Sequence, residues 1–182
     1  MTARRVAVGA AIIAGLLMAA PGGGASADAE GSPGKARLPS PGAAGAGLRA
    51  GVARVDITPD EPVALMGYHN PENRISEGVH DRLYARAIAL GIGPKRVVLV
   101  SCDIASFLFG DYFVRLVSDR WMLQRDEIFL CATHTHSGPQ LSLNAEYPHP
   151  NNARYTRKFE RQIVEVVGRA LGAMAPARMA VG

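Results

Sequence analysis

The sequence predicts an α/β fold: a mixed sheet with a strand–helix–strand crossover and flanking helices. Three observations carry this prediction. Residues 83–92 alternate between large and small side chains, as in a strand with two unlike faces, and a turn at 93–95 leads into an apolar strand at 96–102. An amphipathic helix over 107–124 and a strand over 127–132 follow. This order indicates a right-handed parallel crossover, whereas the turn indicates an antiparallel hairpin.

Further elements surround this unit. A Val- and Ile-rich strand is expected over 50–57, and a loop rich in Pro, Gly and Asn over 60–78. A second long loop over 133–152 precedes a helix over 155–171, and a fifth strand begins at 177–181. Because that strand starts at the end of the sequence, we expect an incomplete N-terminal portion of a larger domain.

The apolar stripes of the two helices predict which faces lie on the sheet. Ser106 is the expected N-cap of the first helix. The inward residues of that helix are expected to be Phe109, Phe113, Leu116, Val117 and Trp121. Those of the second helix are expected to be Phe159, Ile163, Val166, Val167 and Ala170. The continuous apolar run at 96–102 predicts a strand that is buried on both faces.

The N-terminal residues 1–27 have the composition of a secretory signal peptide. Arg4 and Arg5 precede an apolar run of 15 residues, which is shorter than the ~20 that a membrane span needs, and small residues end at a cleavage site after Ala27. We therefore expect a secreted or periplasmic protein. Residues 28–47 are Gly-, Pro-, Ala- and Ser-rich and are predicted to form a flexible linker before the folded part at 48–182.

Charge and cysteine content narrow the function classes. The formal charge of +4 falls to +2 once Arg4 and Arg5 are removed, and no basic aromatic patch is present, so we expect no nucleic-acid binding. Cys102 and Cys131 make no C-x-x-C pair. Each lies in an apolar run, which favours buried thiols, and a disulfide between neighbouring strands is the alternative.

The segment T-H-T-H-S-G-P at 133–139 is the main candidate site. It follows the fourth strand, and ligands gather at the carboxyl ends of parallel strands. In extended backbone, His134 and His136 point to the same face, and imidazole is a common metal ligand. The hydroxyls of Thr133, Thr135 and Ser137 are candidates for fixing the imidazole tautomers. The pair alone is moderately specific, because a solvated loop histidine is the common alternative.

Other polar residues are weaker candidates. Asp103 ends the third strand, where it is expected either to cap the following turn or to support a histidine. His80 precedes the second strand and lies within possible reach of the site. His69 and His149 are expected to be solvated loop residues.

Five motifs occur in an order that resembles a known family. They are G-V-A-R-V-D-I-T-P at 51–59, M-G-Y at 66–68, L-Y-A-R-A at 83–87, V-V-L-V-S-C-D at 97–103 and A-T-H-T-H-S-G-P at 132–139. Together they resemble the N-terminal part of neutral/alkaline non-lysosomal ceramidases. The resemblance implies that 48–182 is the N-terminal portion of a catalytic domain.

The family resemblance also implies chemistry. It implies a zinc-dependent amidase that hydrolyses ceramide, or a similar N-acyl lipid, to sphingosine and a fatty acid. By motif, His134 matches a zinc ligand and His136 the neighbouring histidine that faces the substrate. Peripheral membrane contact is compatible with such a substrate, and the oligomeric state stays open. The family's other zinc ligands would come from sequence after residue 182, so we expect little or no turnover from these residues alone.

Two alternatives stay open at this point. One is a non-catalytic exported remnant or binding module that keeps only part of the site. The other is a related metal-dependent hydrolase with another lipid-like substrate, because the motifs describe a metal site better than an acyl-chain pocket.

Overall fold

The computed structural model of the chain describes residues 47–68 and 74–180. The predicted signal peptide and all but the last residue of the predicted linker lie outside these residues, and so does His69. In the described residues no helix has both the length and the apolar composition needed to cross a membrane.

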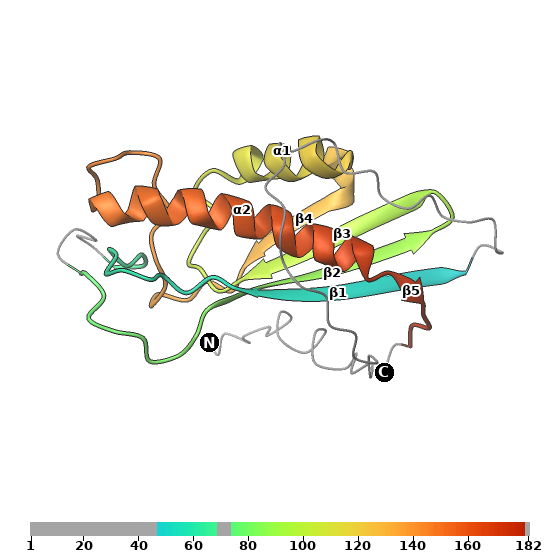
Figure 1. Cartoon of the computed structure of the whole chain (residues 1–182), viewed down its shortest axis with the longest axis horizontal. Coiled ribbons are helices and arrows are strands. Elements are labelled where there is room, and N and C mark those ends of the chain that lie inside the picture. The colour runs from blue at the N-terminus through green and yellow to red at the C-terminus, as the bar shows by residue number, and fades with distance from the viewer. Residues whose placement is uncertain (1–46, 69–73, 181–182) are drawn as a thin grey trace, which may run out of the picture. The chain divides into compact units, whose positions relative to one another are not determined.

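A five-stranded sheet in the order β4-β3-β2-β1-β5 forms the framework (Figure 1). Strands β1, β2 and β3 pair antiparallel, whereas β3 and β4 pair parallel across the helix α1. The predicted mixed α/β sheet, with its hairpin and parallel crossover, is therefore confirmed. The strands are β1 Leu48–Asp56, β2 Tyr84–Ile92, β3 Lys95–Cys102, β4 Ile128–Ala132 and β5 Ala175–Pro176.

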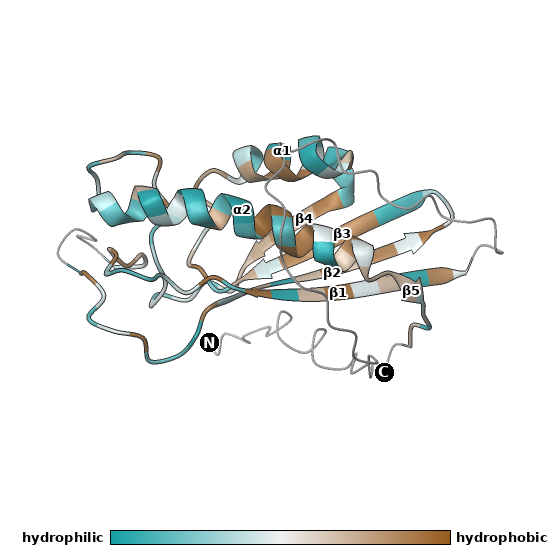
Figure 2. Cartoon of the chain, in the orientation of Figure 1, coloured by the Kyte–Doolittle hydropathy of each residue, from teal (hydrophilic) through white to brown (hydrophobic). Residues whose placement is uncertain are grey.

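Both α-helices cover the same face of the sheet (Figure 1). They are α1 Gly110–Trp121 and α2 Pro150–Gly172, and a short 3-10 helix, η2 Arg125–Glu127, leads into β4. All five inward residues predicted for α2 are buried, and Phe113 and Val117 are buried in α1. These side chains pack against the small residues of β2, Ala85, Ala87 and Ala89. The N-terminal half of α2 is coloured largely hydrophilic, whereas hydrophobic and hydrophilic segments alternate along the strands (Figure 2).

The opposite face of the sheet carries an exposed apolar row. Val52 pairs with Ile88, Ile88 with Leu99, and Leu99 with Phe129, so one apolar residue from each of four neighbouring strands lies in register. Leu99 is 41% exposed and Phe129 53% exposed. The prediction that residues 96–102 are buried on both faces is therefore wrong for the described structure, because helices cover one face only.

Cys131 lies on this same exposed side of β4 and is itself exposed, whereas Cys102 is buried, and both thiols are free. Their residues are offset by one position, since Cys131 pairs with Ser101 and Cys102 with Ala132. The two side chains therefore project to opposite faces of the sheet. The expectation of two buried thiols is correct for Cys102 only, and the alternative disulfide is not formed.

Several element boundaries differ from the prediction. Helix α1 starts at Gly110 with Phe109 as its N-cap and no side-chain cap bond, so Ser106 does not cap it. Helix α2 starts five residues before the predicted position, because Pro150 occupies its first turn, where a missing N–H costs nothing. The fifth strand is a two-residue pairing of Ala175–Pro176 with β1, and the described part of the predicted strand, residues 177–180, forms no strand.

Candidate functional site

The histidine segment directly follows β4 in the sequence. It is hydrogen-bonded to the end of β3 and to the residues that follow β3. The Thr133 N–H donates to the Cys102 carbonyl at 2.9 Å, and the His134 N–H donates to the Ile104 carbonyl at 3.1 Å. His134 then adopts a positive φ of 61°. This left-handed conformation is unusual for a residue other than glycine, and such residues concentrate at functional sites.

The His134 ring is held in a defined orientation. Its Nδ1 lies 2.8 Å from the carbonyl oxygen of Ala105, which is buried. A carbonyl only accepts, so Nδ1 must carry the proton and Nε2 of neutral imidazole has a free lone pair. This is the arrangement that orients histidine ligands in metal sites. The carbonyl of Ala105, and not a hydroxyl of Thr133, Thr135 or Ser137, therefore fixes the tautomer of His134.

The two imidazoles converge. Nε2 of His136 lies 3.2 Å from Nε2 of His134, and their ring planes meet at 74°. With Nε2 of His134 as the acceptor, Nε2–H of His136 is the donor. The expected convergence is present, but its expected cause is wrong, because His134 is left-handed and not extended. The left-handed turn, not strand alternation, sets the ring of His134 opposite that of His136.

His136 is enclosed by the first long loop. The Tyr68 ring meets the His136 ring edge to face, with centroids 5.3 Å apart and planes at 87°. The Arg74 guanidinium lies 4.3 Å from the centre of the Tyr68 ring, and its Nη1 donates to the His136 carbonyl at 2.7 Å. Gly67, at a φ of 114°, faces the His136 ring. Sequence reasoning missed this group, although M-G-Y was among the motifs that it singled out.

The two long loops are fastened to each other by backbone and amide hydrogen bonds. Met66 N–H donates to the Gly138 carbonyl at 3.0 Å, and Gln140 N–H to the Ala64 carbonyl at 2.9 Å. The Asn152 side chain is fully buried, accepts from Ala64 N–H at 2.9 Å and donates to the Ala64 and Gln140 carbonyls at 2.9 and 2.7 Å. One amide on α2 therefore sets the spacing of the loops that carry Gly67 and His136.

Two weaker candidates lie away from the histidine pair. Oδ2 of Asp103 accepts from the Tyr84 N–H and from the Arg86 guanidinium, both at 2.9 Å. Asp103 therefore braces β2 against the end of β3, and neither of its expected roles is correct.

His80 pairs with Asp81 at 2.7 Å, with side chains that are 96% and 86% exposed. His149 is also not a simple solvated residue, because its Nδ1 accepts from the Asn151 N–H as the N-cap of α2.

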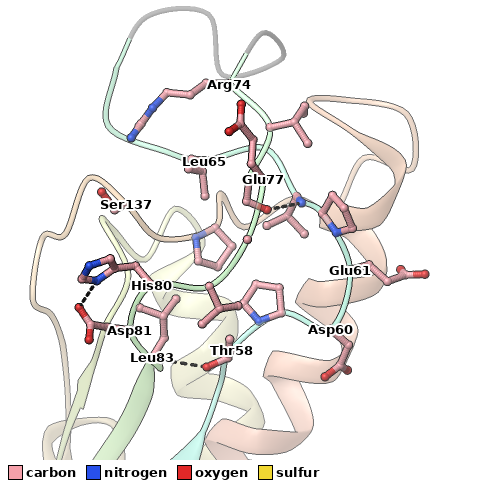
Figure 3. A pocket seen from close by; sticks show the side chains of 18 of the residues that line it. Thr58, Asp60, Glu61, Leu65, Arg74, Glu77, His80, Asp81, Leu83 and Ser137 are labelled. Carbon is pink, nitrogen blue, oxygen red and sulfur yellow. Dashed lines mark hydrogen bonds and ion pairs between the residues drawn. The ribbon is translucent and has the colours of Figure 1, made fainter.

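A cavity of about 810 Å³ lies between the first long loop and the histidine loop (Figure 3). Thr135, Ser137 and Pro139 line it, whereas His134 and His136 do not. Its edge includes the exposed pair of His80 and Asp81. The two imidazoles therefore do not line this cavity, although Arg74 lines it and also contacts the main chain of His136.

The base of the first loop is held by polar contacts to β1 and α2. Burial raises the pKa of the Asp56 carboxyl, but hydrogen bonds from Thr58 and the guanidinium of Arg82 outweigh burial and hold that pKa below its ordinary value. The buried Tyr155 hydroxyl donates to the Ile57 carbonyl at 2.9 Å, and burial raises the Tyr155 pKa well above its ordinary value. These contacts fix where the loop leaves the sheet.

Comparison with known proteins assigns the chain to a family. The family model of neutral/alkaline non-lysosomal ceramidase, N-terminal, matches residues 48–182. The chain belongs to this ceramidase family. The resemblance expected from the five motifs is thereby confirmed, and the match covers all five strands and both α-helices described above.

Individual ceramidases agree with this assignment. The chain is 31% identical to neutral ceramidase A of Dictyostelium discoideum over 71% of its own length and 20% of that protein. It is 31% identical over half its length to the neutral ceramidase of Pseudomonas aeruginosa. The crystal structure of the Pseudomonas aeruginosa neutral ceramidase superposes with a TM-score of 0.58 and 28% identity, covering 72% of this chain and 22% of that one. The chain spans about a fifth of the length of such relatives.

The described part of this ceramidase-family chain fits a metal only in part. Nε2 of His134 has the protonation and orientation of a ligand nitrogen. Two nitrogens on a tetrahedral zinc, each at ~2.05 Å, lie about 3.3 Å apart, so the separation from His136 suits a ligand pair as well as a hydrogen bond. Among the residues described, however, no three His, Cys, Asp or Glu side chains come together.

Proposed function

We propose that this chain is the N-terminal portion of an exported zinc-dependent amidase that hydrolyses N-acylsphingosine to sphingosine and a fatty acid. The observation that carries the proposal is the orientation of His134, whose Nδ1 is committed to the Ala105 carbonyl and whose Nε2 faces His136. This geometry stands in a family whose curated members include neutral ceramidases. Export is proposed from the composition of residues 1–27.

His134 is proposed to hold the zinc through Nε2. Bound zinc would polarise the amide carbonyl and lower the pKa of a bound water toward ~7. The chain's own contribution is to hold His134 in one tautomer through Ala105, so that the Nε2 lone pair, which accepts from His136 in this structure, would be available to the zinc. His136 is proposed to face the substrate. Its Nε2 proton points toward Nε2 of His134, where the zinc would bind.

The substrate class is proposed to be ceramide or a similar N-acyl lipid, with peripheral membrane contact when the substrate lies in a bilayer. The relatives that match this chain are neutral ceramidases, which supports the proposed substrate class. The described residues supply at most two imidazoles to one point, whereas catalytic zinc sites usually have three protein ligands. We therefore expect residues 48–182 to give little or no turnover on their own.

The partial ligand set also favours a second candidate function. In this alternative, the chain is a non-catalytic exported binding module or remnant that keeps the fold and the histidine pair without hydrolysis. A related hydrolase acting on another lipid-like amide or ester is a variant of the first proposal.

A chimera separates these functions. Residues 48–182 would replace the matching region of the Pseudomonas aeruginosa neutral ceramidase, and hydrolysis of a fluorescent N-acylsphingosine would be measured. We expect an active chimera that loses activity in His134→Ala and keeps it in His80→Ala, since His80 is an exposed residue apart from the pair. A folded chimera without turnover would contradict the proposed function and favour the non-catalytic alternative. Turnover of another N-acyl lipid only would favour the variant.

A further inference from the structure

The ring and the main chain of His136 are held by one group of residues from the first long loop. Arg74 makes both contacts that define this group, because its guanidinium stacks on Tyr68 and donates to the His136 carbonyl at 2.7 Å. Tyr68 in turn meets the His136 ring at 87°. We propose that Arg74 and Tyr68 form a clamp, with Gly67 as its floor, that positions His136 against His134.

The clamp is attached to a fixed framework. The Leu65 N–H donates to the Arg74 carbonyl at 2.9 Å, and Ala64 forms a β-bridge with Ile75. Leu65 also forms a bridge with Pro139, three residues after His136. Backbone hydrogen bonds therefore tie together the two arms of the first loop and the histidine loop, so the Arg74 side chain starts from a fixed position beside its target.

The close approach of Gly67 to the His136 ring leaves no room for a side chain at position 67. A Cβ built on Gly67 would lie 2.3 Å from Cγ of His136, which no real contact allows. Its φ of 114° is also a conformation that other residues rarely adopt. Any side chain at this position must therefore displace the imidazole, and the space occupied by His136 depends on glycine here.

Charge and hydrogen bonding give Arg74 a role that lysine cannot fully replace. A planar guanidinium can stack on the Tyr68 ring and donate to a carbonyl at the same time, whereas an ammonium is a compact point charge. Tyr68 is 62% exposed, so the ring has little other packing to hold it. Arg74 therefore orders Tyr68, and Tyr68 and the carbonyl bond together restrict His136.

The clamp is a positioning device and makes no contact with reacting atoms. It deepens the proposed function, since positioning of His136 matters to hydrolysis only if His136 faces the substrate as proposed. The geometric part of the proposal does not depend on that function. The positioning of His136 by Arg74 and Tyr68 can be measured in the purified chain without zinc or substrate.

The test is NMR spectroscopy of the isotopically labelled chain. We expect nuclear Overhauser contacts between the ring protons of His136 and Tyr68, and a narrow set of His136 ring signals. Arg74→Gln should abolish or strongly weaken these contacts, and Arg74→Lys should restore them in part. Arg125→Gln serves as the matched control, because Arg125 pairs with Asp111 at 2.6 Å on the surface and has no contact with the clamp or the first long loop among those described. Unchanged His136–Tyr68 contacts in Arg74→Gln would overturn the proposal.

Variants of Tyr68 test the ring contact with His136 independently of Arg74. Tyr68→Phe keeps the ring and should leave His136 restricted, whereas Tyr68→Leu should release it. Because a loss of folding would also change these signals, the core methyl signals of Val117 and Ile163 are monitored and should not move. If Tyr68→Phe frees His136 as much as Tyr68→Leu does, the ring contact is not what positions His136.

Kinetic measurements on the chimera test the clamp's role in catalysis separately from the proposed function. If the chimera is active, Arg74→Gln should lower kcat by about ten- to a hundredfold with a smaller effect on KM, as expected for a misplaced catalytic group. An inactive chimera with an intact NMR clamp would contradict the proposed function only. An active chimera whose kcat is unchanged by Arg74→Gln would contradict the clamp's role in catalysis.

Discussion

The Nδ1 atom of His134 lies 2.8 Å from the carbonyl oxygen of Ala105, and this one contact determines which imidazole nitrogen of His134 is free. Ala105 belongs to the chain that follows β3, whereas His134 belongs to the chain that follows β4. The parallel pairing of β3 and β4 brings the two segments together at the carboxyl ends of both strands. A sheet register therefore sets the tautomer of the candidate zinc ligand.

The first prediction concerns that tautomer. At a pH where imidazole is neutral, the nitrogen chemical shifts of His134 should report a protonated Nδ1 and an unprotonated Nε2, because only an N–H can satisfy the Ala105 carbonyl. Long-range ¹H–¹⁵N correlation spectra of the chain measure this directly. His149 provides an internal reference of the opposite tautomer, because its Nδ1 accepts from the Asn151 N–H and its proton must therefore lie on Nε2. A His134 ring with its proton on Nε2 would contradict the geometry.

Asn152 should be the most sensitive polar residue in the loop framework. Asn152→Ala removes the acceptor of the buried Ala64 N–H and a donor to the Ala64 and Gln140 carbonyls, so the free energy of unfolding should fall by about 1–3 kcal/mol. Urea unfolding measures the loss. Asn151→Ala is the matched control, because its amide bond to the Pro62 carbonyl is exposed and its loss should cost less. Equal losses in the two variants would contradict the assigned role of Asn152.

The cysteines should differ sharply in reactivity. Cys131 is exposed, whereas Cys102 is buried and burial raises its thiol pKa, so thiolate is scarce at Cys102. A chromogenic disulfide reagent should titrate one thiol in the native chain and two after denaturation. In Cys131→Ser, the native chain should show no rapid reaction. Rapid native labelling of Cys102 would contradict the packing of β3 beneath the helices.

Acid should weaken the anchor of the first loop. The folded-state pKa of Asp56 is lowered, so its contribution to stability is complete above the unfolded pKa near 3.8 and is lost as the pH falls through the lower folded value. Asp56→Asn should therefore be less stable than wild type at neutral pH. The difference should narrow below about pH 4. Urea unfolding across this range tests the sign, and a difference that grows toward acid would contradict it.

Much of the fold follows from local patterns in the sequence. The alternation of Tyr84, Arg86 and Ile88 with alanines predicts the two faces of β2, and the structure confirms it. Periodicity also predicts the inward face of α2, although its start is misjudged. Pro148 and Pro150 around His149 indicate a loop, whereas Pro150 in fact fits the first turn of the helix.

The sequence is less informative where the outcome depends on tertiary contacts. A continuous apolar run does not tell which face of β3 is covered, so the exposure of Leu99 and Cys131 was not predictable. The strand-end position of His134 and His136 does locate the histidine pair. Its partners Ala105 and Arg74 have no local signal, because a backbone carbonyl carries no sequence signature and an arginine in a loop is common.

Zinc titration of the purified chain, followed through the ¹⁵N signals of its histidines, tests the central claim most directly. The account predicts weak, saturable binding that first shifts Nε2 of His134, persists in His80→Ala and disappears in His134→Ala. Binding should be weak because the described residues bring no third ligand to the pair. Zinc that shifts His80 or His149 and leaves His134 unchanged, or binding that His134→Ala does not weaken, would contradict the assignment of His134 as the zinc ligand.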